Sequence, residues 1–169
     1  QAPATKNQYT SLRVPNPSSV TEMAVDMALS ARSLTVPSDW AQAGLSGIFN
    51  NTRTGTVFGD VPAQIYYWTG GDGTVNVHFS TWRNDNAGQH LNLFGDMLAT
   101  GLALGEPHRL RLGWDGAVFT YGVDDLLRTF DPRPLAPVGR APVNPSREVY
   151  ANAGAASGGR ASLTARVDT

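Results

Sequence analysis

The amino-acid sequence predicts an all-β protein built as an antiparallel β-sandwich. Three observations lead to this fold class. The 169 residues include 18 Gly and 11 Pro, with many Ser, Thr and Asn besides, as expected of a chain with many tight turns. Several short runs alternate apolar and polar residues, which is the period of a strand with one buried face. Turn signals separate these runs at short intervals, as they do in sandwiches.

The chain divides into an N-terminal lead-in, residues 1–19, and a single sandwich domain, residues 20–169. Pro15 and Pro17 stop any helix in the lead-in, so we expect at most one short edge strand there, over residues 9–14. The larger part is long enough to bury a substantial core of its own.

The run "SVTEMAVDMALSA", residues 19–31, is the first strand predicted in the domain. Its apolar residues at every second position point to one side, and they are Met23, Val25, Met27 and Leu29. A helix is the alternative, because Met, Ala and Leu favour helices. The strand is preferred because no helical cap or charge pairing accompanies the run. A second strand, "AGLSGIFNN", is predicted over residues 43–51.

The stretch "AQIYYWTGGDGTVNVHFSTW", residues 63–82, predicts a hairpin. Its turn lies at residues 70–73, where glycines supply the positive φ that tight turns need. A polar loop follows at 83–90, and "LNLFGDML", residues 91–98, is a short strand or the start of a helix.

Three short runs within residues 108–130 predict a β-meander, with turns at Asp115-Gly116 and at Asp124-Asp125. The next segment, 131–146, has five prolines and is expected to be a surface crossover. Two strands around the turn "SGGR" end the chain. The total is nine or ten strands with at most one short helix.

Composition excludes several functional classes. The net charge is −1 with no basic stripe, so nucleic acid is not an expected partner. The sequence has no Cys, which excludes thiol catalysis, disulfides and thiolate metal sites. The apolar runs are far shorter than the roughly 20 residues of a membrane span, so insertion is not expected. The chain starts at Gln1, as an exported bacterial protein does after signal-peptide removal, and we expect a secreted or cell-surface location.

Two segments carry a resemblance to a known superfamily. "HRLRLGWDGAVFTYGVDD", residues 108–125, and the closing "ASLTARVDT", residues 161–169, are similar to strands of concanavalin A-like lectin and glucanase domains. The resemblance implies a jelly-roll β-sandwich with a curved sheet whose concave face meets carbohydrate in relatives. Glucanases of this kind carry an "E-I-D-x-E" strand motif that this chain lacks.

The hairpin supplies the candidate ligand-binding residues, which would share one sheet face: Gln64, Tyr66, Trp68, Asn76, His78, Ser80 and Trp82. Arg109 and Arg111 are candidates to extend this patch. Aromatic rings stack on the apolar faces of sugars, while amides and guanidinium groups bind hydroxyls. The leading hypothesis is therefore a lectin-like domain that binds a polysaccharide or oligosaccharide. Ordinary cross-strand packing is the alternative explanation of the patch.

Two other functions stay open, and the first is a polysaccharide lyase or glycoside hydrolase that acts on the same face. Polysaccharide lyases on this fold use a Tyr or His base, and "QIY" at residues 64–66 resembles the "QIH" strand of alginate lyases. The resemblance implies a lyase set of Tyr66, His78 and an arginine clamp, Arg109 or Arg111. The alternative to both is a structural or adhesive surface domain with protein partners.

Calcium is a possible ligand, and no other cofactor is expected. Asp72 in "GGDG", Asp85 in "NDN", or Asp124 with Asp125 would supply the hard oxygen ligands that calcium prefers. Asp and Asn in such turns more often cap their own backbone, which is the alternative. The three histidines lack the spacing of a zinc site.

Overall fold

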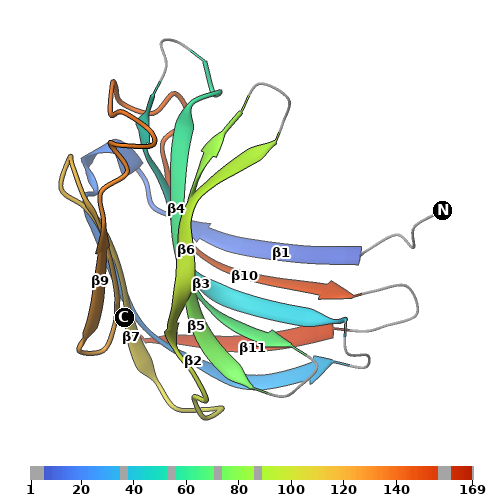
Figure 1. Ribbon diagram of the computed structural model, residues 1–169. Coiled ribbons are helices and arrows are strands. Elements are labelled where there is room, and N and C mark those ends of the chain that lie inside the picture. The colour runs from blue at the N-terminus through green and yellow to red at the C-terminus, as the bar shows by residue number, and fades with distance from the viewer. Residues whose placement is uncertain are drawn as a thin grey trace.

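Two antiparallel sheets make up the molecule, as Figure 1 shows. The computed structural model describes residues 6–34, 38–52, 56–70, 74–85, 89–155 and 161–168. Its strands are β1 (Lys6–Arg13), β2 (Glu22–Leu34), β3 (Trp40–Asn51), β4 (Asp60–Gly70), β5 (Val75–Asn84), β6 (His90–Ala99), β7 (His108–Trp114), β8 (Phe119–Val123), β9 (Leu126–Phe130), β10 (Ser146–Ala155) and β11 (Ala161–Asp168). The predicted β-sandwich is confirmed, with eleven described strands rather than nine or ten.

One sheet has six strands in the order β1-β10-β3-β4-β5-β6, and the other has five in the order β11-β2-β7-β8-β9. Figure 1 shows the six-stranded sheet strongly bent, with its face away from the other sheet on the inside of the bend. We call this the outer face. A single 3₁₀ turn, η1 (Pro17–Ser19), is the helical element of the described residues, and none of their helices has the length and apolarity of a membrane span.

The period-two pattern correctly identified the strands of the five-stranded sheet. In β2 the four alternating apolar residues are buried, with Met27 and Leu29 at most 2% exposed. Strands β7, β8 and β9 are neighbours in the sheet, so the predicted meander is confirmed. The helical alternative for residues 19–31 was wrong, because one face of this segment packs into the sandwich core.

The predicted hairpin is the antiparallel pair β4–β5 in the six-stranded sheet. Its turn, residues 71–73, lies outside the described residues. Residues 91–98 form part of strand β6 rather than a helix. The predicted edge strand of the lead-in is β1, which lies at the edge of the sheet and pairs with β10.

Buried tyrosines anchor the interior between the sheets. The hydroxyl of Tyr67 donates a hydrogen bond to the carbonyl oxygen of Met27 at 2.9 Å, which joins β4 to β2. Tyr121 hydrogen-bonds Thr81 and so joins β8 to β5. Both rings are at most 1% exposed. A buried hydroxyl with a partner avoids the penalty of an unsatisfied polar group, so the core tolerates these residues.

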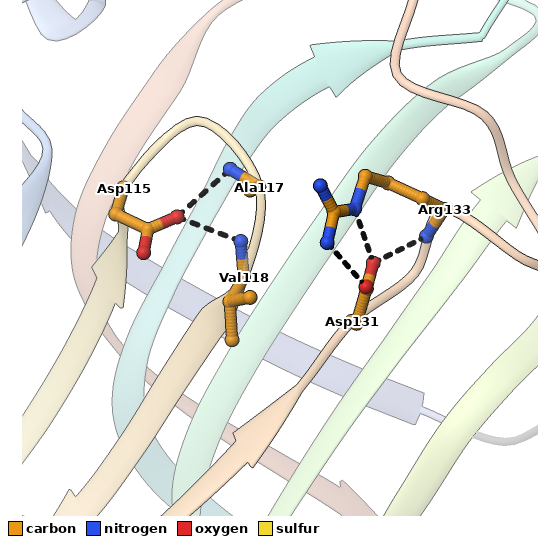
Figure 2. A network of polar contacts seen from close by, with 5 residues as sticks. All are labelled: Asp115, Ala117, Val118, Asp131 and Arg133. Carbon is orange, nitrogen blue, oxygen red and sulfur yellow. Dashed lines mark hydrogen bonds and ion pairs between the residues drawn. The ribbon is translucent and has the colours of Figure 1, made fainter.

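Aspartates fix the turns at the end of the meander, as Figure 2 shows. The carboxylate of Asp115 accepts hydrogen bonds from the backbone N–H groups of Ala117 and Val118 at 2.8 and 2.7 Å. Beyond β9, Asp131 and Arg133 form an ion pair at 2.6 Å. The backbone N–H groups of Val118 and Ala117 lower the pKa of Asp115 below its ordinary value.

The proline-rich segment 131–146 crosses from the five-stranded to the six-stranded sheet, as predicted. The buried carboxylate of Asp60 holds it by accepting the backbone N–H groups of Val143 at 3.0 Å and Asn144 at 3.3 Å. The two closing strands differ from the expectation of a simple pair around a turn. They are β10 and β11, and they belong to different sheets.

Arg147, at the start of β10, is buried at one end of the sandwich. Its guanidinium donates hydrogen bonds to the carbonyl oxygens of Val20, Ile48 and Ser146 at 2.9, 2.6 and 2.7 Å. The same group lies 3.6 Å from the centre of the Phe49 ring. Burial lowers the pKa of Arg147 to about 10, so the side chain is charged at neutral pH. It joins the sheets through backbone groups.

Candidate functional site

The structure brings the predicted hairpin residues together on the outer face. Cross-strand partners are Gln64 with Ser80, Tyr66 with His78, and Trp68 with Asn76. The residues between them, among them Ile65, Tyr67, Val77 and Phe79, are buried against the other sheet. Successive side chains of a strand point to opposite sides, so the predicted residues, Trp82 included, share the outer face. The predicted common face is confirmed.

Arg109 and Arg111 do not extend this patch. Both lie on β7 in the five-stranded sheet, where the alternating Leu110 and Leu112 fill the core. The arginine side chains therefore lie on the opposite side of the sandwich, and Arg109 pairs there with Asp26 at 3.2 Å. The expectation was wrong because the period of a strand identifies its two faces but not the sheet to which it belongs.

Four residues that the sequence did not single out complete the face. Tyr9 of β1, Trp40 of β3, and Glu148 and Tyr150 of β10 join it, because β3, β10 and β1 continue the sheet in that order from β4. The rings of Tyr9 and Tyr150 stack with centroids 5.8 Å apart. A second stack pairs Trp40 with Trp68 at 5.4 Å. Three of the four tryptophans of the chain therefore lie on this face.

A third ring pair lies beyond the tryptophan stack, on β4 and β5. Tyr66 and His78 have centroids 5.8 Å apart with an angle of 20° between the ring planes. Next to them, Trp82 meets the His90 ring edge to face at 5.9 Å. The outer face thus carries several half-buried flat side chains, while Tyr9 is exposed and Tyr150 is buried beside it.

Glycines give the rings the space that they occupy. A Cβ atom at Gly154 would collide with the indole of Trp40, and a Cβ at Gly44 would lie 2.7 Å from the Cβ of Tyr66. Gly44 stands opposite both Tyr150 and Tyr66 on the neighbouring strands. Any larger residue at these two positions would displace the aromatic side chains of the face.

A chain of hydrogen bonds crosses the floor of the face. The hydroxyl of Tyr150 donates to Oε1 of Gln64 at 3.1 Å, and Nε2 of Gln64 donates to Oγ of Ser80 at 2.9 Å. Gln64 and Ser80 also line an open hollow of about 370 Å³, together with Trp82, His90 and Asn92. The hollow therefore combines an indole with amide, hydroxyl and imidazole groups.

Three polar atoms of this face lack a hydrogen-bond partner among the described residues. They are Nε2 of His78, Nε1 of Trp82 and Oδ1 of Asn152. Buried polar groups of folded proteins are normally paired with protein, ordered water or a ligand. The face thus retains unused hydrogen-bonding capacity close to its aromatic rings.

The charge on the face is concentrated at one end. Oε1 of Glu148 accepts a hydrogen bond from the hydroxyl of Tyr9 at 2.5 Å, and Oε2 lies 3.6 Å from Nε of Arg13. Burial raises the pKa of Tyr150, and the neighbouring Tyr66, Tyr9 and Glu148 add to the effect. The pKa of Tyr66 is raised by burial too. Both phenols are therefore neutral hydrogen-bonding groups at physiological pH.

His78 is the titratable group at the centre of the face. Burial lowers its pKa, while the nearby Asp96 carboxylate acts in the opposite direction. The imidazole is therefore neutral at pH 7 and can both donate and accept a hydrogen bond.

The lyase set of residues is brought together only in part. Tyr66 and His78 are stacked neighbours, but Arg109 and Arg111 lie on the other sheet. Neither arginine reaches a ligand that lies on the outer face beside Tyr66 and His78.

The predicted calcium ligands fall in three turns. Asp72 lies outside the described residues. The backbone N–H of Asp85 donates to the carbonyl of Gln89 at 2.8 Å. The carboxylate of Asp124 accepts the backbone N–H of Arg109 at 2.8 Å and contacts Nδ1 of His108 at 2.7 Å, so it joins the β8–β9 turn to the start of β7. Within the described ranges, no group of three His, Asp or Glu residues could hold a metal ion.

Comparison with known proteins identifies the fold. No protein-family model matches the sequence, and no curated protein is similar to it at the sequence level. Among solved structures, the chain is similar to a glycoside hydrolase family 16 endo-glucanase from Bacteroides ovatus, with 14% identity, a TM-score of 0.52, and coverage of 88% of this chain and 69% of that chain.

Two further structures give the same result. A family 16 glycoside hydrolase of the Bacteroides ovatus mixed-linkage glucan locus has 14% identity and a TM-score of 0.54, over 87% of this chain and 66% of that one. A LamA variant from Z. galactanivorans, solved with laminaritriose and laminaritetraose, has 20% identity and a TM-score of 0.50, over 87% of this chain and 61% of that one. The chain thus spans about two thirds of the length of these enzymes.

These likenesses establish the fold of the chain. The chain has the concanavalin A-like jelly-roll fold, as the two resembling segments implied. The bent six-stranded sheet, with its aromatic outer face, is the part of that fold that carries the candidate site.

Proposed function

We propose that this domain is a lectin-like module that binds a polysaccharide along the outer face of its six-stranded sheet, outside the cell. The observation that carries the proposal is the row of exposed or half-buried aromatic rings on one face: Tyr9, Tyr66, Trp40, Trp68 and Trp82. The apolar faces of pyranose rings stack on such side chains. Solved proteins of the same fold were crystallised with oligosaccharides, which supports this ligand class.

The polar groups of the face match the remaining surface of a sugar. Sugar hydroxyls both donate and accept hydrogen bonds, and the hollow offers the amides of Gln64 and Asn92 and the hydroxyl of Ser80. An extended polymer would contact several ring pairs at once, because they follow one another across β1, β10, β3, β4 and β5.

Affinity electrophoresis tests the proposal. We expect the wild-type chain to be retarded in native gels that contain at least one polysaccharide of a panel, and Trp82→Ala to lose most of that retardation. Arg111→Ala is the matched control, since this half-buried side chain lies on the opposite side of the sandwich. Retardation by no polymer, or equal losses in the two variants, would refute the proposed binding face.

A further inference from the structure

We infer that the outer face discriminates by charge, accepting neutral polysaccharides and excluding uronate-rich ones, and that Glu148 is the residue that sets this specificity. The inference rests on the proposed function and adds a class of substrate to it. It reverses the expectation that an arginine of β7 clamps a uronate carboxylate.

The first step is the position of the Glu148 carboxylate. Its strand, β10, lies between β1 and β3, and its side chain is only 13% exposed. Ser46 of β3 is its partner in the sheet, and Gln64 of β4 is the partner of Ser46, so the carboxylate belongs to the same row of the face as the amide that lines the hollow. A polymer that crosses these strands passes over this row.

The second step is the set of cations within reach. On the six-stranded sheet, Arg147 is buried and donates its hydrogen bonds to backbone carbonyls. Arg83 directly follows Trp82 in β5, so its side chain points to the opposite side of the sheet. The described guanidinium that remains on the face is Arg13. It lies 3.6 Å from Glu148, with 77% of its side chain exposed.

The third step compares the two partners of this ion pair. A solvent-exposed guanidinium is strongly screened and gains little from pairing with a charge. The carboxylate is sheltered and accepts the Tyr9 hydroxyl, so its negative charge persists on the face. Tyr66, Tyr150 and His78 are neutral at pH 7, because burial raises the pKa values of the two phenols and lowers that of His78, against the opposite effect of the nearby Asp96 carboxylate.

A sugar carboxylate on this face would therefore meet the like charge of Glu148 at short range, and the described cation beside it, Arg13, is screened by solvent and already paired with Glu148. A neutral sugar can instead donate a hydroxyl hydrogen bond to Glu148. Hydrogen bonds to a charged acceptor are about twice as strong as neutral ones, so the same residue favours neutral ligands and repels acidic ones.

The test uses polymer pairs that share a backbone and differ in charge. The probes are mixed-linkage glucan, xyloglucan and galactomannan, each compared with a derivative in which primary hydroxyls are oxidised to carboxylates. For each protein, affinity electrophoresis gives one dissociation constant for the oxidised polymer and one for the neutral polymer. The measured quantity is the ratio of the first constant to the second. Any general loss of affinity in a variant cancels in this ratio.

For the wild type we expect binding about tenfold weaker to the oxidised polymer at low salt. Concentrated salt should bring this ratio of dissociation constants closer to one, because the Debye length shrinks to about 3 Å at 1 M. Glu148→Gln keeps an acceptor for the Tyr9 hydroxyl but removes the charge, and we expect its ratio to fall below about three. Adding Arg13→Gln to it removes the cation released by the first substitution and should raise the ratio again.

The outcomes are distinct. Equal binding of both polymers by the wild type, or an unchanged ratio in Glu148→Gln, would overturn the charge discrimination and leave the proposed function standing. Retardation by none of the polymers, neutral or oxidised, would refute the proposed function, and this inference with it.

Discussion

The hydroxyl of Tyr150 is the start of the hydrogen-bond chain that positions Gln64 in the hollow. Tyr150→Phe removes this one oxygen and leaves the ring, which is 4% exposed, in place beside Tyr9. Oε1 of Gln64 then loses its donor at 3.1 Å, while Nε2 keeps Ser80 at 2.9 Å. The amide retains one of its two anchors and gains rotational freedom.

The expected loss of stability in Tyr150→Phe follows from the removal of a single neutral hydrogen bond. Such a bond contributes about 0.5–1.5 kcal/mol net, so we expect the free energy of unfolding to fall by about 1 kcal/mol. For a domain of this size that corresponds to a decrease in Tm of about 2–4 °C. If a sugar hydroxyl depends on the orientation of Gln64, affinity falls by a similar free energy, about twofold to tenfold.

Tyr67→Phe is the matched control, because Tyr67 also lies on the six-stranded sheet and its hydroxyl likewise donates a hydrogen bond, to the carbonyl of Met27. Its ring points into the core rather than onto the outer face. Urea denaturation should show comparable destabilisation of both variants, and affinity electrophoresis well below the Tm should show weaker binding only for Tyr150→Phe. Equal affinities for the two variants would refute the role of the chain in binding.

Three other predictions concern stability. Arg147→Met leaves three carbonyl oxygens without their donor, and urea denaturation should show a loss on the order of 3 kcal/mol. The folded chain holds the pKa of Asp115 below its unfolded value, so the ionised carboxylate stabilises the fold above the unfolded pKa near 4, and this stabilisation is lost as pH falls. Asp115→Asn should therefore show a smaller acid-induced decrease in stability. Burial lowers the pKa of His78, so the unfolded chain takes up more protons just below pH 6.5, and stability should fall between pH 7 and pH 5. An unchanged urea midpoint of the wild type over that range, or the same fall in His78→Asn, would contradict this prediction.

Local pattern was enough to predict most strands and the shared face of the hairpin. Alternation in β2, β4, β5 and β7 has a direct physical origin, since one side of each strand is buried. Gln64 and His78 could be placed on one face because their strands are joined by a short turn, which makes them neighbours in the sheet.

Pairing between distant strands could not be predicted in this way. Glu148 and Tyr150 reach the site because β10 lies between β1 and β3, and nothing in the local sequence of β10 specifies those neighbours. Arg109 was misplaced for the same reason, since its strand has the alternation of a half-buried strand in either sheet. Gly44 and Gly154 are understandable only once the rings above them are known.

The connection of β1 to β10 has a consequence for the order in which the molecule is made. Tyr9 and Glu148 are 139 positions apart, and their strands meet only when the last part of the chain is available. Pairings between such distant segments form slowly, because loop closure must precede them. During synthesis β1 therefore stays without its β10 partner until residues 146–155 are available, and binding at the proposed face would report that this pairing has formed.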